Sequence, residues 1–168
     1  MKKGYVITGA ESTGSNFISR CISQSLGNPA DAWDGALFFQ PTEDIKILHR
    51  SQPWGPPRRY TDYKGIAELF EGYETKYILC TRDRGFSDRS KQRRFGRSDS
   101  DLIHNYEVST KILCEIINSG EQFFIWNYET MISLGKVYFD LLYDFLAIDI
   151  DSRKYPAVIN GNEKYLIS

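Results

Sequence analysis

The chain has 168 residues, of which 41% are hydrophobic and 26% charged, a composition typical of a globular protein with one hydrophobic core. We expect a single domain over residues 1–168. The formal net charge of −1 argues against a general binder of nucleic acid or of membrane surfaces. No apolar run is long enough to span a bilayer, and a predicted strand begins too close to Met1 to leave room for a signal peptide. We therefore expect a cytoplasmic protein without a membrane partner.

The first predicted element is a short buried strand at residues 5–7, followed by the loop G-A-E-S-T-G-S-N and then by apolar residues at helical spacing. A strand, a glycine loop and a helix form a phosphate-binding arrangement, because the loop amides and the helix dipole both favour an anion. The glycine spacing is that of a Walker loop, but the Lys-Ser/Thr pair is replaced, so the lysine that reaches a β/γ-phosphate is missing. An ordinary βα turn is the alternative interpretation. The candidate binding residues are Gly9, Thr13, Gly14, Ser15 and Asn16.

Residues 27–44 have the composition of a loop, and residues 45–48 predict a second strand that ends at His49 and Arg50. A proline-containing stretch follows, after which Thr61 or Asp62 can cap a short helix.

Residues 77–80 predict a third strand, which leads into a basic segment. Residues 82–97 carry seven cationic and two acidic side chains, a charge of +5, so the remainder of the chain carries −6. A solvated basic face, or a patch that binds polyanions, is the alternative to a specific anion site here.

A long amphipathic helix is predicted to begin at residues 98–101 and to end at Asn118-Ser119-Gly120. A fourth strand is predicted at residues 123–126, and a last helix at residues 134–146. Strands alternating with helices predict an α/β fold of three layers with a mainly parallel sheet of four to five strands and a P-loop NTPase-like topology. Ligands of such sheets bind at the carboxyl ends of the strands. The segments that follow the four strands should therefore meet at one edge. Cys21, Cys80 and Cys114 lie on predicted apolar faces, which indicates reduced core residues.

Four segments occur in a characteristic order: the glycine loop, His49 after the second strand, Arg82 after the third strand with Ser90 eight residues later, and Tyr128-Glu129-Thr130-Met131 after the fourth. This order resembles the sulfotransferase family that uses 3′-phosphoadenosine-5′-phosphosulfate (PAPS) as donor, and the resemblance covers residues 4–147. It implies a sulfotransferase-like topology and an enzyme that moves a sulfuryl group from PAPS to a hydroxyl or amine, leaving adenosine 3′,5′-bisphosphate (PAP).

The resemblance also assigns roles to residues. Arg82 and Ser90 would hold the 3′-phosphate, Tyr128 would lie near the adenine, and His49 would accept the proton of the acceptor. No metal is required. The acceptor would be a small molecule or a carbohydrate, with no specific nucleic acid as partner, and its identity cannot be derived from the sequence.

The sequence departs from the family in the glycine loop, where Ser12 stands in place of the lysine or arginine that stabilises the leaving oxygen. Arg50, Arg58 and Arg59 lie on loops from which they could replace that cation. The glycine-rich phosphate-binding segment of the family has only a weak counterpart around Gly161. The site is then slow, binds without turnover, or is completed by a second copy in a homo-oligomer.

Two other functions compete with this one. The first is a small-molecule kinase with a P-loop, which is weakened by Ser15 and Asn16 at the positions of the lysine and the Mg²⁺-binding hydroxyl. The second is a non-catalytic protein on the same scaffold that binds a nucleotide or a polyanion through residues 82–97.

Overall fold

The computed structural model describes residues 2–27, 38–54 and 59–166, with the backbone alone at residues 38–41. Its elements occur in the order β1 (Lys3–Gly9), α1 (Ser15–Ser25), β2 (Phe38–Thr42), β3 (Ile45–Ser51), α2 (Tyr63–Leu69), β4 (Glu74–Thr81), α3 (Arg84–Phe95), α4 (Asp99–Asn118), β5 (Gln122–Asn127), α5 (Tyr128–Leu134) and α6 (Lys136–Leu146). Two short 3₁₀ turns, η1 (Ile150–Ser152) and η2 (Glu163–Tyr165), follow.

The five strands form one sheet in the order β2-β3-β1-β4-β5. The strands β3, β1, β4 and β5 are mutually parallel, and β2 pairs antiparallel with β3 at the edge. This arrangement confirms the predicted α/β fold with a mainly parallel sheet. Because the chain leaves β1 toward β3 on one side and returns to β4 on the other, the carboxyl end of β1 is a topological switch point, where α/β sheets bind ligands.

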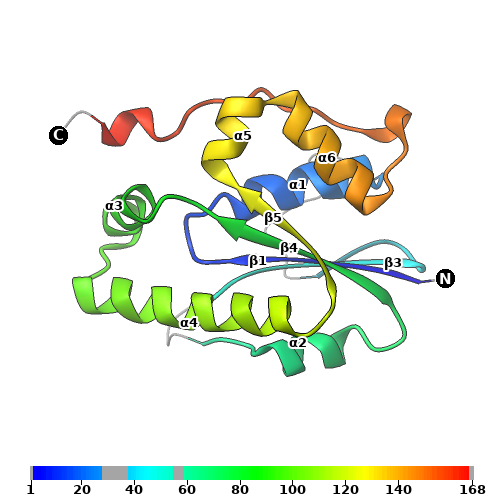
Figure 1. Ribbon diagram of the computed structural model, residues 1–168, viewed down its shortest axis with the longest axis horizontal. Helices are drawn as coiled ribbons and strands as arrows, with labels where there is room; N and C mark the ends of the chain where they lie inside the picture. The colour runs from blue at the N-terminus through cyan, green and yellow to red at the C-terminus, as the bar shows by residue number, and fades with distance from the viewer. Residues whose placement is uncertain (1, 28–37, 55–58, 167–168) are drawn as a thin grey trace.

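Both faces of the sheet are buried, and alternation along each strand divides the apolar residues between them. On one face, Tyr5, Ile7 and Trp126 pack with α1, α5 and α6. On the other face, Val6, Leu48 and Leu79 pack with α2 and α4. Figure 1 shows the sheet between these two helical layers, with α3 beyond the carboxyl ends of the strands.

Several boundaries differ from the sequence-based expectation. Residues 38–42, expected to be part of a loop, form β2. The predicted last helix over residues 134–146 corresponds to α6, and a helix that the sequence analysis did not predict, α5, precedes it; the two meet at Gly135, where φ is 51°. The predicted start of the long helix is confirmed, since Ser98 and Asp101 form a capping box. Cys21 and Cys80 are buried as expected, but the prediction for Cys114 was wrong, because its position on α4 faces outward and is exposed.

Within the described ranges, none of the helices has both the length and the hydropathy that are needed to cross a lipid bilayer.

Candidate functional site

The four segments predicted to meet at one edge of the sheet do so. In the parallel register Gly9 at the end of β1 lies opposite Ser51 of β3 and Cys80 of β4, and Thr81 lies opposite Asn127 of β5. The loop at residues 10–14, His49, Arg82 and Tyr128 therefore surround the carboxyl end of β1.

The backbone of the glycine loop packs closely against β4 and turns sharply before α1. A Cβ on Gly9 would lie 2.2 Å from the Cys80 carbonyl oxygen, so only glycine allows β1 and β4 to approach this closely. Ser12 and Gly14 have positive φ values of 67° and 85°. The conformation of Ser12 is one that side-chain-bearing residues rarely adopt, so its neighbours must hold it.

Hydrogen bonds fix the loop carbonyl groups. The Ser87 hydroxyl donates to the Glu11 carbonyl at 3.2 Å, and Arg82 Nη1 donates to the Ser12 carbonyl at 2.8 Å. Because the C=O and the following N–H of a trans peptide point in opposite directions, the amides of Ser12 and Thr13 point away from Ser87 and Arg82. The first turn of α1 adds further amides without intrahelical partners, since Gly14 provides no side-chain cap. The loop and the helix terminus together form a site suited to an anion.

His49 lies directly at the start of α1. Its Nε2 atom is 3.1 Å from Ser15 Oγ, although the two residues are 34 positions apart in the sequence. Burial, and to a lesser degree the charge of Arg50, lowers the pKa of His49 to about 4. His49 is therefore neutral near pH 7 and able to accept a proton.

A cavity of about 540 Å³ joins His49 to the glycine loop and to the end of α3. Ser12, Gly14, Ser15 and Asn16 line it, and so do two arginines that the sequence analysis did not single out, Arg20 of α1 and Arg94 of α3. Glu11, which also lines it, forms an ion pair with Arg97 at 3.2 Å. The two arginines therefore supply positive charge beside a loop whose own acidic side chain is neutralised.

Arg50 does not share this cavity with His49. Successive residues of β3 point to opposite faces of the sheet, and the Arg50 guanidinium stacks on the Trp54 ring at 4.0 Å from its centroid. Arg59 is exposed and its backbone pairs with Trp54. Arg58, also considered from the sequence, lies outside the described residues.

Arg82 is held by neutral groups. Its Nε and Nη2 atoms both donate to Asn162 Oδ1, the first at 3.1 Å, while Nη1 binds the Ser12 carbonyl. The Tyr128 ring stacks on the guanidinium, with its centroid 4.5 Å from Cζ. The same ring limits Gly14, because a Cβ there would lie 3.0 Å from Tyr128 Cδ2.

Ser90 is buried on α3 with 3% of its surface exposed. The C-terminal segment 159–165 covers this region: Arg89 donates to the Tyr165 carbonyl at 2.5 Å, and Tyr165 is itself buried. The Arg82 guanidinium lies 5.9 Å from the centroid of the Tyr165 ring, so chain from the end of the protein contacts both Arg82 and the helix that carries Ser90.

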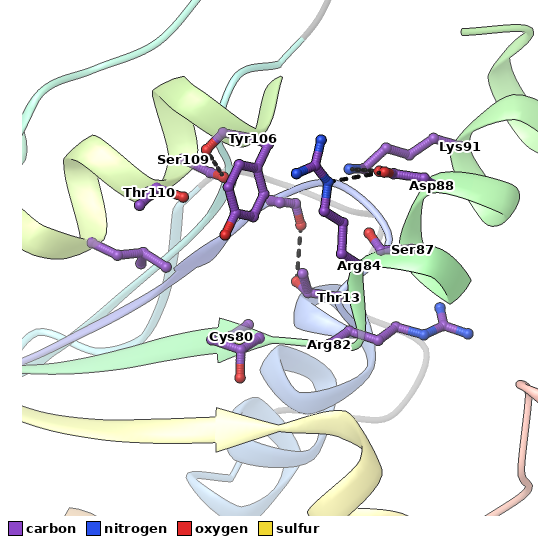
Figure 2. Close-up of a pocket in the computed structure, with 13 residues that line it drawn as sticks. Thr13, Cys80, Arg82, Arg84, Ser87, Asp88, Lys91, Tyr106, Ser109 and Thr110 are labelled. Carbon is purple, nitrogen blue, oxygen red and sulfur yellow. Dashed lines mark hydrogen bonds and ion pairs between the residues drawn. The ribbon is translucent and has the colours of Figure 1, made fainter. Parts of the chain in front are cut away.

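A second cavity, of about 210 Å³, lies on the other side of the loop between β4, α3 and α4. Figure 2 shows Lys91 and Arg84 meeting at Asp88 in this cavity, while the Arg82 side chain points away from it. Lys91 is 2% exposed, and its ammonium is 3.0 Å from Asp88 Oδ1. Asp88 is shared by two cations, so this cavity also carries net positive charge. The cavity with His49 differs from it in holding an imidazole beside the glycine loop.

The sequence could not have identified Arg20, Arg94 and Asn162 as members of the site. Arg20 follows Ser15 by five residues on α1, and Arg94 is one of several arginines in the basic segment, so neither has a distinctive local pattern. The only signal for Asn162 was its neighbour Gly161 in I-N-G-N.

The chain matches no model of a known protein family, no curated protein and no solved structure, so the interpretation of the site rests on its own residues.

Proposed function

We propose that the protein is a sulfotransferase that moves a sulfuryl group from PAPS to a hydroxyl or amine acceptor, with His49 as general base. The observation that carries this proposal is the contact between His49 Nε2 and Ser15 Oγ at the head of the anion-binding loop. It brings a neutral imidazole and the amides of a helix terminus into one cavity, the combination that transfer from an anionic donor to a protonated acceptor requires.

The residues present fit the donor at its 5′ end. The Ser12 hydroxyl is buried without a hydrogen-bond partner among the described residues, and it lines the cavity together with Gly14, Ser15 and Asn16. The loop has no lysine, and a phosphosulfate has no γ-phosphate that would need one.

The donor supplies an activated sulfuryl group, which forms a bond to the acceptor oxygen or nitrogen as its bond to the bridging phosphate oxygen breaks. His49 takes the acceptor proton at Nε2. A bound anion raises the pKa of His49 above its value in the empty cavity, because the negative charge stabilises the imidazolium.

Arg20 and Arg94 are the residues proposed to stabilise the negative charge that develops on the leaving oxygen, in the place of the cation that Ser12 cannot provide. They line the cavity of His49, whereas Arg50 stacks on Trp54. This assignment replaces the expectation that Arg50 or a neighbouring loop arginine serves this role.

Calorimetry with PAP and AMP tests the proposal. PAP is expected to bind more tightly than AMP, since only PAP has a 3′-phosphate for Arg82. Arg82→Ala should weaken PAP binding about tenfold or more, because a charge-assisted hydrogen bond contributes about 1.5–3 kcal/mol. AMP binding should weaken less than PAP binding, because Arg82 affects the 5′ site only through its bond to the Ser12 carbonyl.

Arg84→Ala is the matched control, since Arg84 is the next arginine along the chain and its side chain pairs with Asp88. It should leave the affinities for both nucleotides as they are. Equal affinity of the wild-type protein for PAP and AMP would remove the sulfotransferase proposal.

A further inference from the structure

The side-on edge of the Arg82 guanidinium is occupied in this structure. The Nε and Nη2 atoms form the edge of a guanidinium that binds a phosphate or carboxylate side-on. Both atoms donate to the single oxygen Asn162 Oδ1, and Nη1 is bound to the Ser12 carbonyl. The Tyr128 ring covers one face. A phosphate can therefore reach Arg82 side-on only after the Asn162 side chain has left.

The segment 159–165 is held in place by a small number of polar contacts. Gly161 N donates to the Tyr128 hydroxyl at 3.0 Å, and that hydroxyl donates to the Ile159 carbonyl at 3.3 Å. Asn162 Nδ2 donates to Glu129 Oε1 at 2.9 Å, and Arg89 Nη1 donates to the Tyr165 carbonyl at 2.5 Å. Figure 1 shows this segment, drawn in orange to red, running back over α5 to end beside α3.

The apolar anchoring of the segment is weak. Asn162 and Tyr165 are buried, with 6% and 5% of their surfaces exposed, but Ile159 and Leu166 are 79% and 64% exposed. Apolar residues that remain exposed contribute little to anchoring, so we expect the segment to open at low cost in free energy.

We propose that the segment 159–165 is an internal competitor for the 3′-phosphate site: the Asn162 amide oxygen occupies the edge of Arg82 that the phosphate of PAP takes, and PAP binding releases the segment. This inference rests on the proposed function. The neutral amide oxygen is a weaker acceptor than a phosphate dianion for the same two N–H groups. Nucleotides without a 3′-phosphate leave the segment in place.

Calorimetry on a variant that lacks residues 159–168 tests the proposal. The deletion is expected to raise the affinity for PAP about tenfold, the effect of one charge-assisted hydrogen bond, because no competing amide has to be displaced. The affinity for AMP should stay unchanged. Asn162→Ala should also raise the affinity for PAP. This variant tests the proposal if the shortened chain does not fold.

Leu166→Ala is the matched control, since Leu166 is exposed, uncharged and in the same stretch of chain. It should leave both affinities unchanged. Hydrogen exchange provides a second measurement: amide exchange in residues 159–165 should increase when PAP is added to the full-length protein and not when AMP is added.

The two proposals fail in different ways. If the wild-type protein prefers PAP to AMP but the deletion and Asn162→Ala leave PAP affinity unchanged or lower it, the segment is part of the binding site and the competitor proposal is wrong. If wild-type protein and both variants bind PAP and AMP equally, the proposed function fails and the competitor proposal fails with it.

Discussion

At the scale of a single residue, burial sets the protonation state of the His49 ring. Strand β3 places this ring against the start of α1, where burial disfavours its charged form and the charge of Arg50 adds to the effect. The ring is therefore neutral over the range in which most proteins function. It can accept a proton, and its basicity depends on whether an anion lies in the cavity.

The pH dependence of stability is expected to report this burial. The pKa of His49 is about 6.5 in the unfolded chain, and burial lowers it to about 4 in the folded protein. Between these values the unfolded state binds more protons, so the free energy of unfolding should fall by up to about 3 kcal/mol as the pH falls through this window. Denaturant unfolding at a series of pH values measures it.

His49→Gln should flatten the stability curve between pH 4 and 6.5, because the titrating group is gone. His104→Gln, on the exposed side of α4, is the matched histidine substitution and should keep the slope of the wild-type curve. An unchanged slope in His49→Gln would contradict the buried, neutral state of the ring.

The same substitution bears on turnover. A positioned general base contributes about 10²–10⁴-fold to a rate, so His49→Gln should lower sulfuryl transfer by about 10²-fold or more while donor affinity hardly changes. Single-turnover assays with labelled donor, together with calorimetry, separate the two effects. A variant that loses donor affinity and rate equally would assign His49 to binding instead of proton transfer.

At the scale of an element, α1 and the loop before it form the anion-binding unit. The helix begins at Gly14 and ends near Gly27, and both glycines have positive φ, 85° and 94°. Their surroundings differ. A Cβ on Gly14 would touch the Tyr128 ring at 3.0 Å, whereas a Cβ on Gly27 would meet nothing within 4 Å. The two ends of one helix thus provide a matched pair of substitutions.

Gly14→Ala and Gly27→Ala should each lower the free energy of unfolding by roughly 1–2 kcal/mol, the cost of a side chain in the left-handed region. Only Gly14→Ala should also weaken binding of PAP and AMP, because the added methyl displaces Tyr128 and the loop. Thermal unfolding and calorimetry on both variants check this. Equal nucleotide affinity in the two variants would show that the loop does not hold the 5′-phosphate.

At the scale of the whole molecule, the strand order places the loop of β1 between segments from both halves of the chain. His49 of β3 reaches it from one side, and Arg82 after β4 from the other. Arg97, beyond α3, then pairs with Glu11. Positive charge thus comes from several distant segments, whereas a Walker loop has a lysine of its own.

This distribution of charge predicts a negative result with ATP. Ser15 and Asn16 provide neither the lysine that contacts a β/γ-phosphate nor the Walker hydroxyl for Mg²⁺. We expect no ADP formation from ATP and Mg²⁺ with hydroxyl or amine acceptors, measured by a coupled assay. Mg²⁺-dependent ADP formation, abolished by His49→Gln, would instead support the kinase hypothesis.

The sequence by itself determined the elements that depend on local patterns. The period of the apolar residues predicted the four parallel strands and α4, and the Ser98–Asp101 cap predicted where α4 begins, because both signals arise from neighbouring residues. It also predicted that the loop, His49, Arg82 and Tyr128 meet at one edge, since parallel strands end on the same side of a sheet. Strand β2 and helix α5 were missed, as neither has a strong local period.

Only the tertiary structure decided what each site residue contacts. Ser15 approaches His49 across 34 residues of chain, and Asn162 reaches Arg82 across 80. Arg94 shares a cavity with His49, whereas Arg50, next to His49 in sequence, turns to the other face of the sheet. Such contacts depend on strand order and on the path of the C-terminal segment. These are set by the packing of apolar faces over the entire chain, and no short stretch of sequence encodes them.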